Sequence, residues 1–272
     1  MMIKRLKSSL SAYTFMSVHL IGFAIFFVIP FFSMVLYSFR KGFFDSSFAG
    51  FTNYIKIFNN IPFQLALKNN AIFMLVAIPL IVMFSFVIGF LLYELKVPRW
   101  IKLAFILPIF IPSGAVIGFY RSFFTDMLES EQVMIALILI FIWKNLGYNL
   151  IIYLATFGSM HRDIMDYAKV DGANFMQTIY HVVWPMTIPS TFFVVIVSIV
   201  NSFKVFKDIY LLQGNYPNQA IYMVQNFMNN KFRDLQVEQL SAAAVVFTCF
   251  LFAGVLLFLT IERRYLRKVS RD

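Results

Sequence analysis

The sequence predicts an all-α integral membrane protein with six transmembrane helices, formed by a single domain over residues 1–272. The first observation is composition, because the chain is 60% hydrophobic and 13% charged, whereas soluble domains are about 25% charged. The second is length, since a helix needs roughly 20 apolar residues to cross a hydrocarbon layer about 30 Å thick. Six stretches meet this requirement, and they are 14–39, 70–93, 101–120, 133–157, 186–207 and 241–261.

The first apolar stretch follows a basic segment, as the core of a signal peptide would. Lys4, Arg5 and Lys7 precede it. The stretch is longer than the apolar part of a signal peptide, lacks an obvious small-residue cleavage site and leads directly to further spans. We therefore interpret it as a retained transmembrane helix.

Basic residues predict the orientation, because the cytoplasmic loops of membrane proteins are enriched in Lys and Arg. The C-terminal tail ERRYLRKVSRD is strongly basic, and the connector 121–131 between the third and fourth spans is acidic on balance. Both observations favour a topology with the two termini in the cytoplasm. On this topology the polar segment 162–184 also faces the cytoplasm.

Residue types and spacings argue against several kinds of site. The net charge of +10 does not indicate nucleic-acid binding, because Lys and Arg lie at the termini and in short connectors. The eleven glycines include no G-x-x-x-x-G-K, so we expect no ATP site, no catalytic residues and no bound cofactor in this chain. His19, His161 and His181 have no Cys or carboxylate at ligand spacing, so no metal site is expected. The single Cys249 cannot form an intramolecular disulfide.

The polar segment 162–184 has the pattern of two short helices joined by a turn. Residues 162–170 are compatible with a helix, and Gly172 can adopt the left-handed conformation that ends one. The Asp171 carboxylate can then accept backbone N–H bonds at the start of a second helix over 173–181. The segment is therefore expected to form a rigid elbow.

Small residues and prolines flank the elbow. Ala168 and Ala173 would let another protein approach the backbone closely. Pro185 lies where the chain enters the fifth span, and Pro189 is expected within its first turn, where a missing N–H costs little. These features suit a surface that contacts a cytoplasmic partner.

The segment resembles the cytoplasmic loop of permease subunits in binding-protein-dependent ATP-binding-cassette importers. That loop has the motif E-A-A-x-x-D-G-A, then five residues, then F-x-x-I-x-x-P. In this sequence the motif positions are filled by Asp166, Ala168, Asp171, Gly172, Ala173, Ile179, Val182 and Pro185. Asp166 replaces the Glu, and Tyr167 replaces the first Ala. The resemblance implies that the loop is the coupling helix, which docks in a groove of an ATPase subunit.

Three other segments are similar to sugar permeases of the same family. They are FAGFTNYIKIF after the first span, WKNLGYNLIIYLATFGSM in the fourth and FKVFKDIYLLQGNYP at the end of the fifth. Asn215 and Tyr216 stand where relatives commonly have glycines. The resemblance points to the carbohydrate branch, and to a subunit similar to the maltose-type larger permease.

The resemblance implies a type I importer permease fold in the bacterial cytoplasmic (inner) membrane, crossed several times and surrounded by lipid. It also implies a set of partners. They are a second, different permease subunit, two nucleotide-binding ATPase subunits that bind ATP and Mg²⁺, an extracytoplasmic solute-binding protein and a sugar substrate.

Polar residues within the spans are candidates for a substrate pathway, because neutral sugars are bound by amides, hydroxyls and aromatic faces. One stripe lies on the fourth span and another on the fifth. Their members are Asn145, Tyr148, Asn149, Ser198, Asn201, Ser202 and Val205. The resemblance implies a sugar site near Asn145 and at Ser198, Ser202 and Val205. Alternatively, these groups hold the helices together by interhelical hydrogen bonds.

Charged residues in the spans add further expectations. Lys144 would cost about 2.5–3.5 kcal/mol at the centre of a bilayer, so it should face a cavity or the outer interface. Lys204 and Asp208 are one helical turn apart and are expected to pair.

Prolines and glycines make the third span unusual. Pro108 and Pro112 should kink it, and Gly114 and Gly118 would allow close helix packing.

Two other functions remain open at this point. An importer of another solute, such as an amino acid or an anion, would use the same mechanism, and Lys144, Lys204 and Lys207 leave room for acidic sugars. An ion-coupled carrier or channel is the other alternative. Such a carrier would keep carboxylates at mid-membrane depth, whereas the one acid of note in the spans, Asp208, is near the outer end of the fifth.

Overall fold

The computed structural model describes residues 16–42, 44–160 and 162–269. Within these ranges the chain is helical, apart from turns, loops and an isolated bridge between Arg40 and Phe48. Some positions considered above lie outside the described residues, namely Lys4, Arg5, Lys7, residues 14 and 15 of the first apolar stretch, and His161.

The helices with their bounds, in chain order, are as follows. A helical run Met16–Ser38 contains the π-helix η1 (Ala24–Val28) and α2 (Ile29–Ser38). The next are α3 (Thr52–Phe58), α4 (Ile61–Glu94), α5 (Arg99–Ile106), the 3₁₀-helix η2 (Leu107–Phe110), α6 (Ser113–Phe123), α7 (Thr125–Leu128) and α8 (Val133–Ser159). The last are α9 (Arg162–Val170), α10 (Phe175–Thr178), the π-helix η3 (Ile179–Val183), α11 (Trp184–Ser202), α12 (Val205–Gln213), the 3₁₀-helix η4 (Gln219–Ile221), α13 (Val224–Arg233) and α14 (Val237–Val269).

The chain divides into two compact units. The first comprises residues 1–63 and 228–251, and the second comprises 64–227 and 252–272. In the first unit, the end of α2 is held to α3 by the buried Asn53 amide, which donates to the carbonyl oxygens of Ser38 at 3.0 Å and Arg40 at 2.7 Å. A hydroxyl contact of 2.7 Å between Ser38 and Tyr54 completes this junction.

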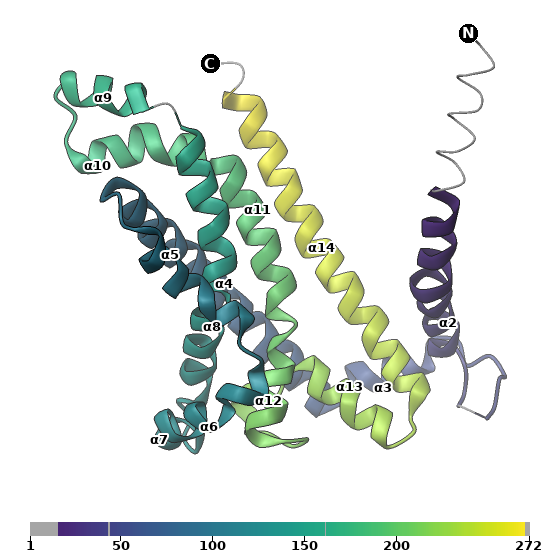
Figure 1. Cartoon of the computed structure of the whole chain (residues 1–272). Helices are drawn as coiled ribbons and strands as arrows, with labels where there is room; N and C mark the ends of the chain where they lie inside the picture. Colours follow the sequence, from purple (N-terminus) through teal and green to yellow (C-terminus); the bar gives the residue numbers. More distant parts are fainter. Residues whose placement is uncertain (1–15, 43, 161, 270–272) are drawn as a thin grey trace, which may run out of the picture. The chain divides into compact units, whose positions relative to one another are not determined.

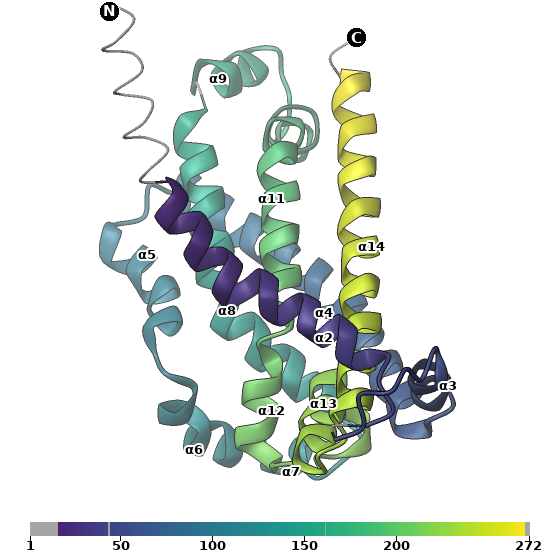
Figure 2. The ribbon, with the colours of Figure 1, turned by 90° about the vertical axis from the view of Figure 1, so that its right-hand side faces the viewer.

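The second unit contains the segments that bear on function, and its two ends differ. Helices α9 and α10 lie at one end of α8 and α11, whereas α6, α7 and α12 lie at the other end (Figures 1 and 2). The candidate coupling segment therefore lies at the opposite end of α8 and α11 from α6, α7 and α12.

The predicted number of spans agrees with the structure when one broken pair is counted as a span. Among the described residues, five continuous helices are long and apolar enough to cross a membrane. They are Met16–Ser38, Ile61–Glu94, Val133–Ser159, Phe175–Gln213 and Val237–Arg264. The sixth is the pair Arg99–Phe110 and Ser113–Phe123, which is bent by 99°.

The third span is broken rather than kinked, which corrects the single helix expected over 101–120. Ile111 and Pro112 have extended backbones, with ψ angles of 119° and 138°. A residue before proline is disfavoured in the helical region, and proline lacks the N–H that would continue the helix. With Pro108 and Pro112 four residues apart, the chain leaves the helix between η2 and α6.

The fifth span extends well beyond 186–207, because the helix passes through its prolines. Pro185 is at the start of α11, but the π-helix η3 immediately precedes it, and the helical run begins at Phe175. Pro189 therefore lies inside α11 and not in the first turn of the span. The Trp184 N–H donates to the carbonyl oxygen of Ile179, five residues earlier, which is the π-helical pattern, and the helix then continues through Pro185.

Two apolar clusters form the core of the second unit. One joins α4, α6, α8 and α12 through residues such as Phe73, Leu137, Phe141 and Ile209. The other joins α4, α8, α9 and α11 near the coupling segment, and it consists of Phe86, Phe90, Tyr153, Phe157, Met165, Val183 and Val194. The segment at 162–184 is thus anchored in the same core as the spans.

A glycine that the pattern analysis did not single out sets the closest approach around α8. A Cβ added to Gly147 would lie 2.8 Å from Ile109 Cδ1 and 3.0 Å from the Cα of Ile106. In contrast, a Cβ at Gly114 or Gly118 would have no other described atom within 4 Å. Within the described chain no helix packs closely at Gly114 or Gly118, although α6 contacts α12 elsewhere, so the close packing that these glycines would allow stays a prediction.

Candidate functional site

A cavity of about 260 Å³ lies where the broken third span meets α8, α11 and α12. The break contributes Pro108, Pro112 and Ser113 to its lining. Non-helical backbone at membrane depth is tolerated where it is buried in protein or lines a water-filled space. The break in the third span therefore creates a polar hollow beside α8.

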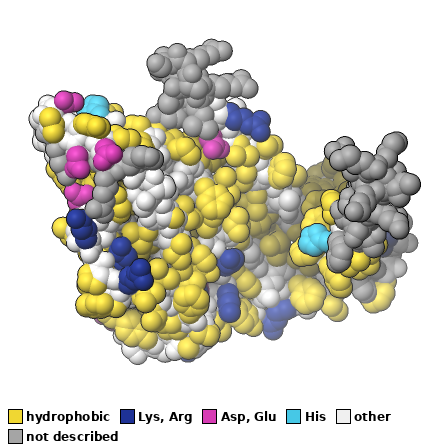
Figure 3. All heavy atoms as spheres, turned by 45° about the horizontal axis from the view of Figure 1, so that its top comes forward, with side chains coloured by type: hydrophobic (Ala, Val, Ile, Leu, Met, Phe, Trp, Pro, Cys, Tyr) yellow, Lys and Arg dark blue, Asp and Glu magenta, His cyan; other side chains and the backbone are white. Residues whose placement is uncertain are grey.

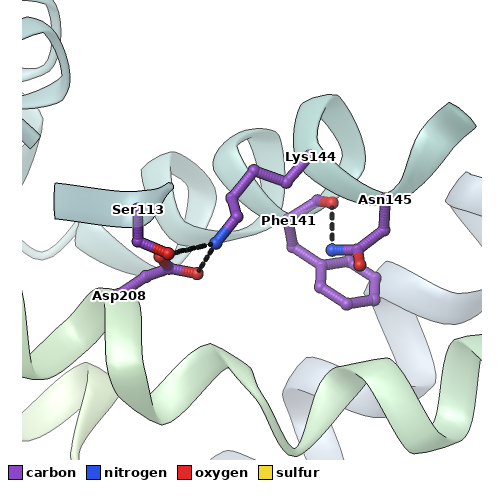
Figure 4. Close-up of polar contacts among 5 residues, drawn as sticks. All are labelled: Ser113, Phe141, Lys144, Asn145 and Asp208. Atoms are coloured by element: carbon purple, nitrogen blue, oxygen red, sulfur yellow. Dashed lines mark hydrogen bonds and ion pairs between the residues drawn. The ribbon is translucent and has the colours of Figure 1, made fainter. Parts of the chain in front are cut away.

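An ion pair forms one wall of this cavity. The Lys144 ammonium donates to the two carboxylate oxygens of Asp208 at 2.7 and 2.8 Å, and to the Ser113 hydroxyl oxygen at 2.8 Å (Figure 4). The expectation that Lys144 faces a cavity is confirmed. Three elements, α6, α8 and α12, meet at this ammonium.

The expected pairing of Lys204 with Asp208 was wrong. The Lys204 ammonium donates instead to the Asn201 side-chain oxygen at 2.9 Å. Lys204 caps the start of α12, after a turn at 203–204, so the two residues do not share an uninterrupted helix face. Asp208 is buried and therefore pairs with Lys144, which is similarly shielded from water; their side chains are 5% and 20% exposed.

Four of the predicted pathway residues meet around the cavity. Asn145, Tyr148, Asn201 and Val205 all line it. The Asn145 amide donates to the Phe141 carbonyl oxygen at 2.9 Å, which is a bond along its own helix (Figure 4). The cavity thus combines amides and an aromatic ring with charged groups, which are the contacts that a polyhydroxyl solute can use.

The other three predicted pathway residues lie outside the cavity lining and are buried. Asn149 on α8 donates to the Ser198 hydroxyl on α11 at 2.9 Å. Ser198 in turn donates to the Val194 carbonyl at 2.8 Å, and Ser202 donates to the Ile199 carbonyl at 2.6 Å. Asn149 and Ser198 therefore make the interhelical bond that was the alternative reading, and a role for Asn149, Ser198 and Ser202 in the pathway stays a prediction.

The α8–α11 contact continues toward the coupling end through two more hydroxyl pairs. Tyr153 bonds to Thr191 at 3.0 Å, and Thr156 bonds to Ser190 at 2.7 Å. With Asn149 and Ser198, these bonds recur about once per helical turn along the contact. The two helices are thereby linked from the neighbourhood of the cavity to the level of α9.

The coupling segment has the expected helix–turn–helix form. Gly172 has a φ of +81°, in the left-handed region. The Ala173 N–H donates to the Ala168 carbonyl oxygen at 2.9 Å, which closes the end of α9 as a Schellman motif. A side chain at position 172 would be strained in this conformation, which explains the glycine.

The residue that caps the second helix is Asn174, which corrects the assignment to Asp171. The Asn174 side-chain oxygen accepts from the Gln177 N–H at 2.9 Å, and the Gln177 side chain accepts from the Asn174 N–H at 2.8 Å. This is a reciprocal capping box. Two further residues are needed after Gly172 for the chain to reverse, so α10 begins at Phe175.

The outer face of the coupling segment carries both apolar and acidic groups. Its exposed large side chains are Tyr167, Val170, Phe175, Met176 and Tyr180. Asp166, Asp171, Gly172 and Pro185 are also exposed, whereas Ala168 and Ala173 are half-buried. Acidic side chains and a histidine gather over this end of the second unit, and hydrophobic side chains dominate the rest of the face shown (Figure 3).

Comparison with known proteins decides the family. A family described as the binding-protein-dependent transport system inner membrane component matches residues 46–271. The chain belongs to this family. The resemblance inferred from the coupling motif is confirmed, and the family is one of non-catalytic membrane subunits.

Individual relatives align with most of this chain. The probable starch degradation products transport system permease protein AmyD of Thermoanaerobacterium thermosulfurigenes is 25% identical, over 96% of this chain and 97% of its own length. The arabinooligosaccharides transport system permease protein AraP of Bacillus subtilis (strain 168) is 27% identical, over 75% and 73%. A crystal structure of a bacterial alginate ABC transporter with its periplasmic protein has a chain of the same fold, at a TM-score of 0.80 and 20% identity, covering 96% of this chain and 97% of that one.

The sequence patterns missed three features of this permease-family site. Ser113 completes the contacts of Lys144, Gly147 allows α5 and η2 to approach α8, and Asn174 caps α10. An N-x-x-Q pattern at 174–177 was a readable signal for the cap. Ser113 and Gly147 had no such signal, because their roles depend on where the third span lies after its break.

Proposed function

We propose that this chain is one transmembrane subunit of an ATP-driven importer for sugars or oligosaccharides. The observation that carries the proposal is the membership of residues 46–271 in a family of binding-protein-dependent transport components. Relatives such as AraP and AmyD are described as permeases for arabinooligosaccharides and starch degradation products, which supports a saccharide as the solute.

The cavity beside the broken span is the proposed solute pathway. Its lining includes Asn145, Tyr148 and Asn201, which supply amide and phenol groups for sugar hydroxyls and an aromatic ring for sugar C–H faces. Its volume of about 260 Å³ is slightly below the usual range of ligand pockets, roughly 300–1,000 Å³. A second permease subunit, expected to be a different chain, would complete the pathway.

The coupling segment is the proposed contact with one of the two ATPase subunits, which would bind ATP and Mg²⁺. Val170 and Met176 are 84% and 70% exposed. Covering these apolar side chains with the groove of a partner would remove them from water and stabilise the complex. On the inner side, Met165 is buried in the apolar cluster that includes Phe86 and Phe90 of α4. Movement of the ATPase subunits would therefore reach the spans through a packed and capped elbow rather than a flexible loop.

Alternating access is the mechanism that follows. An extracytoplasmic solute-binding protein delivers the sugar to the α6, α7 and α12 end, and ATP binding closes the two ATPase subunits. The segment 162–184 transmits that closure to α8 and α11, whose polar contacts extend to the neighbourhood of the cavity. This requires both termini and the coupling segment to face the cytoplasm of a bacterial inner membrane.

The test is to purify the chain from the native membrane and to reconstitute it with the subunits that accompany it. ATP-dependent uptake of a saccharide delivered by its binding protein is expected. An ion-coupled carrier or channel would instead transport without a copurifying ATPase, and that result would overturn the proposal. An importer of an amino acid would retain ATP dependence but would not respond to any saccharide.

A further inference from the structure

We propose that the cavity selects solutes that carry an anionic group, such as a sugar acid or a sugar phosphate, over their neutral counterparts. The inference rests on the proposed function, because it takes the cavity at the broken span as the solute pathway. It is drawn from the charges that line the cavity and from the partners that each of them has.

The cavity lining contains three ammonium groups and a single carboxylate. Lys144, Lys204 and Lys207 provide the positive charges, and Asp208 provides the negative one. The lining therefore has a formal charge of +2, from three Lys and one Asp. Although only 13% of the chain is charged, four charged residues line this one cavity, of which Asp208 is buried and Lys204 and Lys207 are exposed.

The single carboxylate neutralises one lysine and leaves the other two. Both Asp208 carboxylate oxygens accept from the Lys144 ammonium, at 2.7 and 2.8 Å, so the charge of Asp208 is compensated by Lys144. Lys204 bonds to Asn201, a neutral acceptor that leaves the ammonium charge uncompensated. The Lys207 ammonium has no hydrogen-bond or ion-pair partner among the residues that the structure describes. Two ammonium groups thus remain available to a ligand.

A neutral sugar does not require free ammonium groups for its recognition. Asn145, Asn201 and Tyr148 already supply donors and acceptors for hydroxyl groups. Bonds between an ammonium and a carboxylate or phosphate are shorter and about twice as strong as neutral ones. The lysine ammonium is a compact charge on a flexible side chain, unlike the planar guanidinium of arginine. It can therefore bind either a carboxylate or a phosphate. The lining combines sites for hydroxyl groups with unused positive charge, and a sugar bearing an anionic group satisfies both.

The test measures binding to the assembled importer in lipid nanodiscs without the solute-binding protein, so that selectivity belongs to the membrane subunits. The ligands are a glucose trisaccharide and the glucuronic acid trisaccharide of the same linkage. Glucose and glucose 6-phosphate form a second pair, which distinguishes a preference for carboxylate from one for phosphate. We expect the acidic member of at least one pair to bind about tenfold tighter at low salt, and this preference should fall as salt is raised.

Variants assign the preference to the two lysines. Lys207→Gln alone and Lys204→Gln with Lys207→Gln should weaken binding of the acidic ligand, by about tenfold for the double variant, and leave the neutral ligand within about twofold. Lys207→Arg retains the charge and should retain the preference. Lys96→Gln is the matched control, because Lys96 is exposed but is not part of the cavity lining.

The outcomes separate this inference from the proposed function. Equal binding of acidic and neutral ligands, no binding of either acidic ligand, or an unchanged preference in the Lys204 and Lys207 variants would overturn the inference. ATP-driven uptake of a neutral sugar would persist in those cases if the proposed function holds. Loss of the function itself would appear as a failure of any saccharide to drive ATP-dependent uptake.

Discussion

The Lys144 ammonium lies 2.7 Å from one carboxylate oxygen of Asp208 and 2.8 Å from the other, although 64 positions separate the two residues in the chain. This ion pair joins α8 to α12 at the wall of the cavity, and Ser113 from the broken third span contacts the same ammonium. The position of the break is thereby tied to the two helices beside it.

Removing one partner of this pair should destabilise the assembled protein more than removing both. Asp208→Asn or Lys144→Met alone leaves a charge in a site shielded from water, at a cost of about 3 kcal/mol or more. The double variant Lys144→Met with Asp208→Asn should recover much of that loss. Thermal unfolding of the purified complex, read as a double-mutant cycle, measures the coupling. Additive losses in the double variant would show that the pair contributes no specific interaction.

Asn145 and Asn149 occupy the same helix but should behave differently. Asn145 lines the cavity, so Asn145→Ala should raise the substrate concentration needed for half-maximal uptake and leave stability nearly unchanged. Asn149 bonds to Ser198, so Asn149→Ala should lower stability by about 1 kcal/mol, the scale of interhelical hydrogen bonds in membranes. Uptake kinetics and thermal unfolding of both variants check this pair. A kinetic defect in the Asn149 variant without any loss of stability would instead support its predicted role in the pathway.

The left-handed turn at Gly172 should be required for coupling. Gly172→Val forces a branched side chain into a backbone with a φ of +81°, at a cost of about 1–3 kcal/mol that distorts the elbow. We expect substrate-stimulated ATP hydrolysis by the complex to be lost while membrane insertion is retained. Gly158→Ala is the control, since Gly158 lies in α8 with no other atom within 4 Å of an added Cβ. Normal stimulation in Gly172→Val would remove the elbow from the mechanism.

The exposed apolar face of the coupling segment should hold the ATPase subunits. Val170→Glu places a charge where the proposed groove is apolar, so the ATPase subunits should no longer copurify with the permease. Leu95→Glu makes the same kind of change at an exposed position in the α4–α5 connector, and should leave copurification intact. Quantifying the subunits that remain bound after affinity purification distinguishes the two. Equal retention in both variants would argue against the proposed docking face.

Gly147 should be intolerant of any side chain, whereas Gly114 should accept one. An alanine at Gly147 brings its Cβ within 3.0 Å of the Ile106 Cα, a backbone atom that cannot rotate away. Such overpacking costs about 1–3 kcal/mol. Gly114→Ala meets open space and should be neutral or slightly stabilising. Thermal unfolding of the two variants makes the comparison, and equal stability would mean that α5 and η2 do not rest on α8 as described.

Much of the candidate site could be predicted from local patterns. The Gly172 turn followed from a single residue type, and the exposure of Lys144 to a cavity followed from the cost of a charge in lipid. The partner of Lys144 could not be predicted, because Asp208 is one helical turn from Lys204 in the sequence and 64 positions from Lys144. Asn149 and Ser198 were likewise recognisable as polar residues in spans, but the sequence does not show whether they face each other or a cavity.

The sequence by itself determined the membrane class, the approximate positions of the spans and the elbow at 162–184. These properties depend on residues that are close together in the sequence, since a span is recognised from about 20 consecutive residues and a helix end from the few residues around it. The tertiary structure decided the break in the third span, the Lys144–Asp208 pair, the division of the polar stripes between cavity and interhelical contacts, and the approach at Gly147. Those depend on how helices far apart in the sequence are rotated and packed against one another, which no local pattern specifies.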